Sequence, residues 1–251
     1  MVRTIFLAGA SGAIGRRLSM LLVEAGLRVV GTTRNDDGAA ALRGLGVEPV
    51  VLDIFDEPAV IDAVVRARPE VIINQLTALS ALKSGAIKEA LASNARIRME
   101  GTPMLVRAGA LAGARRLISQ SIAWLYAPGR LPHVEEDPLK GADGEDAVTV
   151  GGVKALEQAT LTAAPMAGVV LRYGWLYGPG TGRDEPMAQP GVHVDAAAHA
   201  ALLSIDRAPA GAIFNVAEPS PGLSSGKAIR LLGWDPGFRI VTAERQELPA
   251  H

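Results

Sequence analysis

The glycine-rich segment between residues 9 and 15 constrains the fold of this chain more than any other feature. An apolar run over residues 2–8 leads into Gly9-Ala10-Ser11-Gly12-Ala13-Ile14-Gly15, and an amphipathic helical pattern follows over residues 16–25. In this setting the first glycine permits a tight turn, the second lets the backbone approach a phosphate, and the third lets strand and helix pack closely. The helix start would offer N–H groups and a partial positive charge to a pyrophosphate. The segment therefore predicts a dinucleotide-binding βαβ unit.

Strand and helix patterns continue to alternate along the chain. Because the strands are apolar on both faces, the alternation indicates a parallel sheet covered on both sides. We predict an α/β fold: a doubly wound parallel (Rossmann) sheet over residues 1–172, with a small C-terminal substrate-binding portion over residues 173–251 packed on it. The expected strands are 2–8, 27–33, 47–52, 70–73, 115–120 and 168–172, and the expected helices are 16–25, 37–45, 58–67, 85–113 and 149–163.

Two segments between these elements have their own predictions. Pro103 is expected to kink the long helix over residues 85–113. Residues 127–147 are rich in proline, glycine and acids, which predicts a long surface loop of the kind that often covers a binding site. Its three consecutive acids, residues 135–137, are expected to be solvated rather than to bind a metal.

Composition narrows the function classes. The net charge of −1 gives no field that would attract nucleic acid or an anionic membrane. The absence of cysteine excludes disulfides, thiol nucleophiles and cysteine-bound zinc. No apolar run approaches the roughly 20 residues of a membrane span, and the N-terminus does not read as a signal peptide. We expect a cytoplasmic protein that acts on a small molecule, with no metal, nucleic-acid or membrane partner.

The end of the second expected strand bears on the choice of dinucleotide. NAD-binding chains usually place Asp or Glu about 20 residues past the glycine loop, where it holds the ribose 2′-hydroxyl. Here residues 31–34 read Gly-Thr-Thr-Arg, and the first acid is Asp36. Arg34 can pair with a 2′-phosphate, and Arg16 is a second candidate. This favours NADP, with NAD possible; the alternative is that both arginines are solvated surface residues.

Several segments, taken in order, resemble the extended branch of the short-chain dehydrogenase/reductase superfamily, the NAD(P)-dependent epimerase/dehydratase group. The resemblance implies an oxidoreductase, epimerase or dehydratase that acts on a small sugar-like or carbonyl substrate and often forms a homodimer. The matching segments are the glycine spacing, Asp53-Ile54, Asn94 with Gly101-Thr102, residues 171–180 (LRYGWLYGPG), residues 193–197 (HVDAA), and Lys227-Ala228 with residues 232–236 (LGWDP).

The resemblance also implies the cofactor contacts. The expected set combines the glycine loop with residues that follow the next three strands and one lysine of the helix over residues 149–163. These residues are Gly9, Ser11, Gly12, Ala13, Ile14, Gly15, Arg34, Asp53, Ile54, Leu76 and Lys154.

The family's catalytic set is Ser or Thr after the fifth strand, followed by Tyr-x-x-x-Lys on the next helix. The tyrosine is the general acid/base, and the lysine lowers its pKa. Ser121 matches the serine position, with Ser119 as the alternative, and Lys154 matches the lysine. Val150 stands four residues before Lys154, where the tyrosine is expected, and valine cannot donate a proton.

Other residues are candidates for the missing proton donor. Tyr173 and Tyr126 follow the sixth and fifth expected strands, where ligands bind in such sheets. Tyr177 and His193 also remain candidates. Three functions stay open: an NAD(P)-dependent oxidoreductase or epimerase/dehydratase, a non-catalytic NADP-binding sensor, and a redox-neutral lyase or cyclase that uses the same pocket.

Overall fold

The computed structural model describes residues 2–78, 87–144 and 146–241. A seven-stranded sheet in the order β3-β2-β1-β4-β5-β6-β9 runs through the molecule, and every neighbouring pair is parallel. The predicted α/β class and doubly wound parallel sheet are confirmed. The strands are β1 (Thr4–Ala8), β2 (Arg28–Thr33), β3 (Glu48–Val51), β4 (Val71–Asn74), β5 (Arg116–Ile122), β6 (Ala167–Tyr173) and β9 (Ala212–Val216).

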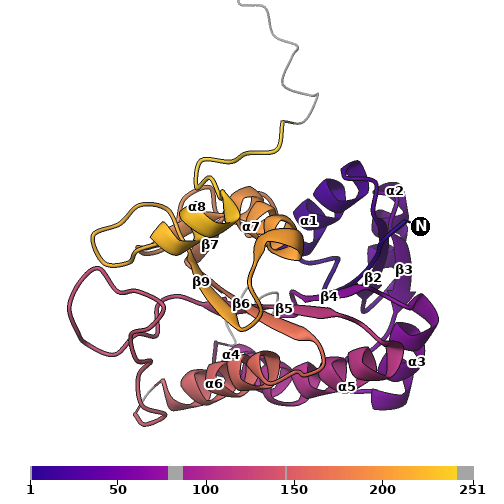
Figure 1. Ribbon diagram of the computed structural model, residues 1–251, viewed down its shortest axis with the longest axis horizontal. Coiled ribbons are helices and arrows are strands. Elements are labelled where there is room, and N and C mark those ends of the chain that lie inside the picture. Colours follow the sequence, from indigo (N-terminus) through magenta and orange to yellow (C-terminus); the bar gives the residue numbers. More distant parts are fainter. Residues whose placement is uncertain (1, 79–86, 145, 242–251) are drawn as a thin grey trace, which may run out of the picture.

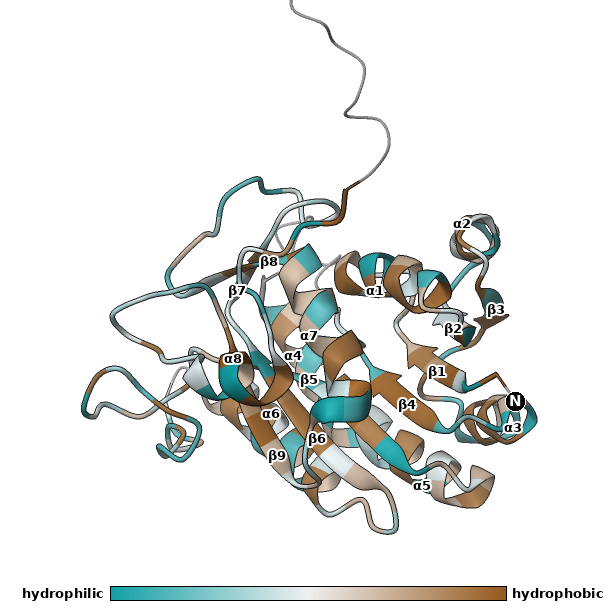
Figure 2. Ribbon diagram, turned by 45° about the horizontal axis from the view of Figure 1, so that its top comes forward, coloured by the Kyte–Doolittle hydropathy of each residue, from teal (hydrophilic) through white to brown (hydrophobic). Residues whose placement is uncertain are grey.

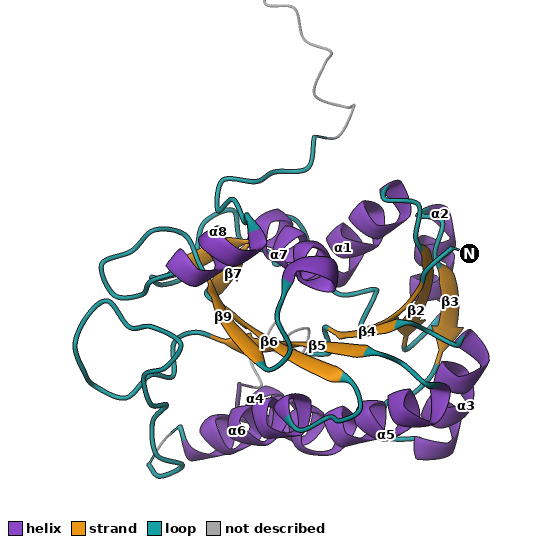
Figure 3. Ribbon diagram, in the orientation of Figure 1, coloured by secondary structure: helices purple, strands orange, loops and turns teal. Residues whose placement is uncertain are grey.

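Helices cover both faces of the sheet, as Figures 1 and 3 show. On one face lie α1 (Ala13–Glu24), α2 (Asp36–Gly44), α7 (Val194–Arg207) and α8 (Gly226–Leu232). On the other face lie α3 (Glu57–Ala67), α4 (Ile87–Arg96), α5 (Thr102–Ala112) and α6 (Ala147–Leu161). No helix in the described part of the chain is long and apolar enough to cross a membrane.

Local sequence signals explain where the helices begin. The Asn35 side chain accepts a hydrogen bond from Gly38 N at 2.9 Å and caps α2. Asp56 accepts from Ala59 N at 3.1 Å and caps α3, whose first turn contains Pro58. The helix α1 differs, because its N-cap residue, Gly12, has no side chain that could cap the helix. Its first N–H groups are therefore available to a ligand.

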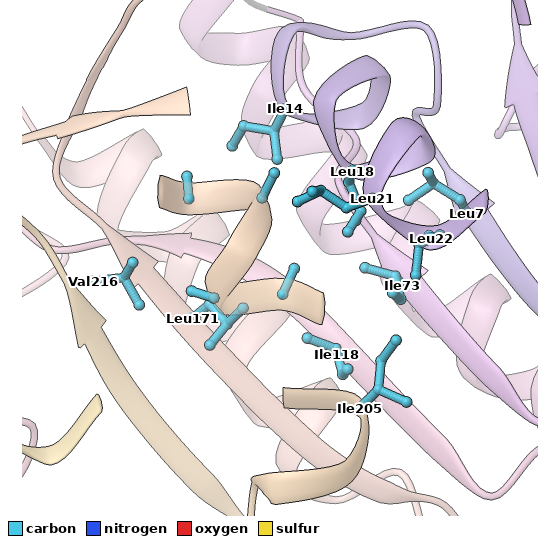
Figure 4. Close-up of a cluster of buried hydrophobic side chains, with 14 of the residues drawn as sticks. Leu7, Ile14, Leu18, Leu21, Leu22, Ile73, Ile118, Leu171, Ile205 and Val216 are labelled. Atoms are coloured by element: carbon cyan, nitrogen blue, oxygen red, sulfur yellow. The ribbon is translucent and has the colours of Figure 1, made fainter. Parts of the chain in front are cut away.

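The larger of the two main cores lies between the sheet and the layer of α1 and α7 (Figure 4). Leu18 and Leu22 of α1 are fully buried against Ile73 and Ile118 of the sheet. The buried face of α7 is mostly alanine, so this helix packs closely on α1 and the sheet. Figure 2 shows the apolar strands between helices whose outer faces are hydrophilic.

The long helix predicted over residues 85–113 is divided in the structure. Residues 85 and 86 lie outside the described part, and α4 and α5 are joined by a π-helical turn, η2 (Ile97–Gly101). Pro103, the second residue of α5, closely follows this turn. Because the backbone stays helical through Arg96, Gly101 and Thr102, the missing N–H of Pro103 interrupts the helical hydrogen bonds at this point. The irregularity thus lies in the π-helical turn just before the proline, in a type of turn that is frequent at functional sites.

The C-terminal part belongs more closely to the sheet than the sequence suggested. β9 pairs with β6 in the main sheet, and α7 packs on α1. Only β7 (Trp175–Tyr177) and β8 (Gly191–His193) form a separate two-stranded parallel sheet. The segment after residue 172 therefore supplies the seventh strand of the core as well as the small additional sheet.

Replacing Leu18 by alanine should lower the free energy of unfolding by about 2 to 5 kcal/mol, because it leaves a cavity in the main core. Leu111→Ala is the matched control, since Leu111 is 62% exposed on α5 and should change stability by less than about 0.5 kcal/mol. Urea denaturation followed by circular dichroism measures both. Equal losses for the two variants would contradict this description of the core.

Candidate functional site

The glycine loop is fixed by close backbone contacts. Gly9 has φ +83°, and a Cβ there would lie 2.7 Å from the carbonyl oxygen of Gln75. A Cβ on Gly15 would lie 2.2 Å from the carbonyl oxygen of Gly9, so the start of α1 packs directly on the turn. Gly9 N donates to Thr32 Oγ1 at 2.9 Å, which ties the turn to β2. The first and third glycines thus have the packing roles predicted for them.

Gly12 has a different environment. It is exposed, and a Cβ on it would meet only the carbonyl oxygen of Gly9, at 3.3 Å. Ser11 and Ala13 beside it are half-buried, whereas Ile14 is buried in the core. The space above Gly12 and the uncapped start of α1 therefore fit a pyrophosphate, which needs close backbone approach and free N–H donors.

The other predicted cofactor residues lie at the carboxyl ends of β2, β3 and β4. Arg34 and Asp53 are exposed at the ends of β2 and β3, and Asp53 Oδ1 accepts from Phe55 N at 3.0 Å. Ile54 is buried beneath Gly101, and Leu76 is half-buried after β4. These residues continue the edge that begins at the glycine loop. Carboxyl ends of parallel strands are where such sheets bind ligands.

Arg16 and Gln75 are two further polar residues near the loop. Arg16 Nε donates to the carbonyl oxygen of Ser11 at 2.8 Å, which holds its guanidinium over the loop. Gln75 was missed from the sequence, where only its position after an apolar strand marks it. Its Nε2 donates to Tyr173 Oη at 3.3 Å, and its buried Oε1 has no partner among the described residues. A buried amide oxygen without a donor is rare, so this oxygen is available to a ligand.

Two of the three residues predicted to be catalytic, Ser121 and Tyr173, lie on opposite faces of the sheet. In the β5–β6 register Ser121 lies opposite Arg172 and Ile122 lies opposite Tyr173, so Ser121 and Tyr173 point to opposite faces of the sheet. Ser121 is fully buried, and its Oγ donates to Glu157 Oε1 at 2.7 Å. The hydroxyl is therefore engaged by a carboxylate of α6.

Tyr173 and Lys154 lie in different environments, since Tyr173 is buried and Lys154 is exposed. Burial raises the pKa of Tyr173 well above its usual range, and its Oη donates to the carbonyl oxygen of Ala197 at 3.2 Å. This placement favours a structural role for Tyr173 over the predicted catalytic one. Lys154 is exposed on α6, beside the buried Val150 and Val153.

A buried network of charged and polar groups joins β5, β6, β9 and α6. Arg172 binds Glu157 through two hydrogen bonds, Nε to Oε1 at 2.9 Å and a terminal nitrogen to Oε2 at 2.7 Å. Arg172 also donates to Tyr126 Oη at 2.8 Å, and Tyr126 donates to Asn215 Oδ1 at 2.6 Å. Buried ion pairs persist when further hydrogen bonds satisfy them, and this network meets that condition. Tyr126 is thus a member of the network.

Glu135 corrects the expectation that the acids at residues 135–137 are solvated. Its side chain is buried, and Oε1 accepts from Asn215 N at 2.8 Å. Only Glu136 and Asp137 follow the prediction: Glu136 is largely exposed beside Lys227, and Asp137 accepts from Val134 N at 3.0 Å. The buried acid fixes the long loop after β5 to the sheet, which sequence composition alone did not indicate.

His193 and Tyr177 form a second polar cluster, on the small β7–β8 sheet. His193 Nδ1 accepts from Asp195 N at 3.1 Å and caps α7, and burial lowers the pKa of this imidazole. Tyr177 Oη donates to Glu218 Oε1 at 2.5 Å and meets the His193 ring edge-on. The Tyr177 hydroxyl and the Nδ1 atom of His193 are thus engaged by neighbouring groups.

An apolar wall occupies the position where the resemblance predicts the tyrosine. Val150 and Val153 of α6 are fully buried with Leu125, and Trp124 packs against these three. Trp124 stacks on Trp175, with ring centroids 4.5 Å apart and an angle of 9° between the planes. We call the buried trio with Trp124 and Trp175 the apolar wall. It contains no group that could give or take a proton at neutral pH.

These features define a Rossmann-type fold with a glycine loop of the dinucleotide-binding kind. The family model described as the NAD dependent epimerase/dehydratase family matches residues 5–193. The chain therefore belongs to this family, as the sequence motifs indicated.

Relatives and solved structures agree with that assignment. A Streptomyces protein named 3-diazoavenalumate denitrifying reductase is 37% identical over 95% of this chain and 90% of its own length. The dTDP-4-dehydrorhamnose reductase of Streptomyces griseus is 32% identical over 68% of this chain and 49% of its own length. The fold is similar to UDP-glucose 4-epimerase of Thermotoga maritima, with TM-score 0.74, 17% identity and 94% of both chains covered.

Replacing Glu157 by glutamine should lower the free energy of unfolding by about 3 to 5 kcal/mol, because Arg172 would keep a buried charge without its partner. Glu48→Gln is the matched control: it breaks an Arg–Glu pair whose side chains are 40% and 56% exposed and should cost less than about 1 kcal/mol. Denaturant titration measures the difference. Similar values for both variants would show that the buried network does not stabilise the fold.

Proposed function

We propose that the protein is an NAD(P)H-dependent reductase that delivers hydride to a substrate needing no proton from the protein. The observations that carry this proposal are the apolar wall at Val150 and the glycine loop, whose packing is intact. The cofactor cradle argues for dinucleotide chemistry. The wall argues against the tyrosine-dependent protonation of a carbonyl oxygen, because it supplies no acid.

The chain's own residues have three tasks in this proposal. Gly12 and the uncapped start of α1 bind the pyrophosphate, and the Gln75 amide offers an acceptor within the site. A bound reduced nicotinamide supplies the hydride. The apolar wall excludes water from the reaction centre, which strengthens electrostatic interactions there and protects a reactive substrate from hydrolysis.

The name of the Streptomyces reductase suggests a substrate that meets these requirements, namely a diazo compound. Addition of hydride to the terminal nitrogen of a diazonium ion gives a diazene. The diazene then loses N₂, and its hydrogen remains on carbon. The substrate gains two electrons and one hydrogen from the reduced dinucleotide, so the products are a C–H bond, N₂ and the oxidised dinucleotide. No protein acid is needed for this sequence.

Purified protein should accelerate oxidation of NADPH by a stable diazonium salt, with one N₂ released for each dinucleotide oxidised. Reactions without protein give the background rate. Gly12→Val is the control for a cofactor-dependent reaction, because its side chain would fill the space above the loop. The proposal fails if the rate equals the background, or if carbonyl substrates are reduced and diazonium salts are not. Tight NADPH binding without turnover of any substrate would instead support a sensor.

We further propose NADP as the preferred dinucleotide, on the basis of Arg34 at the end of β2 and the lack of an acid there. Arg34→Ala should weaken NADPH binding about tenfold or more while changing NADH binding little, because a charged hydrogen bond to the 2′-phosphate is lost. Arg43→Ala is the control, as it removes an arginine from the far end of α2. Isothermal titration calorimetry measures all four affinities. Equal loss for both dinucleotides would exclude this role for Arg34.

A further inference from the structure

We infer that Trp124 and Trp175 bind the aromatic ring of the substrate, which makes the substrate an arenediazonium ion. This inference rests on the proposed function and names the class of diazo compound that it acts on. It is carried by the position, exposure and chemistry of the stacked indoles.

The pair lies at the carboxyl ends of two adjacent parallel strands. Ile122 lies opposite Tyr173 in the β5–β6 register, so two residues further along each chain Trp124 faces Trp175. Ala123 N donates to the carbonyl oxygen of Tyr173 at 2.9 Å, and thus the two segments remain paired up to the tryptophans. The stacked rings therefore stand where ligands bind in this kind of sheet.

The backbone holds Trp175 firmly in this position. Its N–H donates to the carbonyl oxygen of Pro190 at 2.8 Å, and Gly174 before it donates to the carbonyl oxygen of Val216 at 3.1 Å. A Cβ on Gly174 would lie 2.6 Å from Pro190 O, so the turn out of β6 needs a glycine. Trp175 is thus held in place before a ligand binds, so that stacking of a ligand on its indole costs little conformational entropy of the protein.

The pair differs from the third tryptophan of the chain. Trp234 is 2% exposed and its Nε1 donates to the carbonyl oxygen of Ala196 at 2.8 Å, as a core residue does. Trp124 and Trp175 are only half-buried, and within the described residues neither indole N–H donates to a protein acceptor. Both rings therefore keep surface and a hydrogen-bond donor available to a ligand.

Trp124 also packs against the buried cluster of Leu125, Val150 and Val153, which connects the pair to the position where the family's tyrosine is expected. Indole faces are electron-rich and attract aromatic rings and cations. An arenediazonium ion is planar and carries its positive charge in conjugation with the ring, so it satisfies both preferences. A sugar ring needs polar donors and acceptors, which the apolar wall does not provide.

The reaction then takes a defined form. Hydride adds to the terminal nitrogen of the arenediazonium ion, and the resulting aryl diazene loses N₂ while its hydrogen passes to the ring carbon that held nitrogen. The ring remains aromatic, and the stacked tryptophans position it throughout. Trp124 and Trp175 are substrate-binding residues in this account and take no part in proton transfer.

Binding of an unreactive ring cation tests this inference without turnover. The probe is 1-methylpyridinium, and 1,1-dimethylpiperidinium is its counterpart with the same charge and no aromatic ring. Both are titrated into the full-length protein with NADP⁺ present, using calorimetry for affinity and tryptophan fluorescence for location. We expect the aromatic cation to bind and quench fluorescence, and to bind at least about tenfold more tightly than the piperidinium.

Substitutions then locate the site. Trp124→Leu and Trp175→Leu should each weaken binding of 1-methylpyridinium about tenfold, whereas Trp124→Phe and Trp175→Phe keep a ring and should stay within about threefold of the wild type. Phe238→Leu is the matched control, because it removes a different half-buried stacked pair, with His199, whose ring centroids are 3.9 Å apart. This control should leave the affinity unchanged.

The outcomes separate this inference from the proposed function. Three results would overturn the inference that the tryptophan pair binds the ring of the substrate (the aromatic platform). These are no binding of the aromatic cation, equal binding of the two cations, or wild-type affinity in both leucine variants. If diazonium salts are then still reduced, the proposed function stands without it. Tryptophan-dependent binding without diazonium reduction has the opposite meaning: the platform stands and the proposed reaction fails.

Discussion

The carboxylate of Glu157 organises the buried polar side chains near the carboxyl ends of β5 and β6. It accepts two hydrogen bonds from Arg172 and one from Ser121, and all three side chains are buried. A buried carboxylate needs such partners, because its unpaired charge would cost several kcal/mol. Ser121 is thereby held on the α6 side of the sheet, engaged with the carboxylate.

The same network fixes the elements around it. Through Arg172 and Tyr126 it reaches Asn215 of β9, and through Asn215 it reaches Glu135 of the long loop. The long loop, which follows β5 in the chain (Figure 1), is thus attached to the sheet by buried hydrogen bonds. Consequently, the buried polar groups of this region stabilise the fold, and the buried cluster at Val150 is apolar.

The fold could be predicted from the sequence, because it leaves a clear glycine pattern and alternating strand and helix patterns. Gly9 and Gly15 make close backbone contacts that only glycine allows, so the glycine pattern identifies the fold. The seventh strand, β9, was missed because its signal is five residues long and lies among glycine and proline turns. The burial of Glu135 was also missed, because a partner such as Asn215 is distant in sequence and only the folded chain brings the two together.

The catalytic set was harder to predict for a related reason. The family pattern assigns roles by position and gave Ser121 and Lys154, whereas Tyr173 was a candidate for the missing proton donor because it follows the sixth strand. Strand alternation separates Ser121 from Tyr173, and α6 presents Lys154 to solvent. The sequence predicts that Val150 stands at the tyrosine position. Its surroundings, two buried aliphatic side chains and a stacked pair of indoles, were visible only in the structure. Together they support the proposal of a hydride-transfer site without a proton donor.

Isotope effects on steady-state turnover of a diazonium salt test that central claim most directly. NADPH deuterated at the transferred position should give a normal primary isotope effect, because hydride transfer limits the rate. Replacing H₂O by D₂O should leave the rate nearly unchanged, since no protein acid moves a proton in the same step. A large solvent isotope effect together with a loss of the primary effect would contradict the account, because it would place proton transfer from the protein in the rate-limiting step.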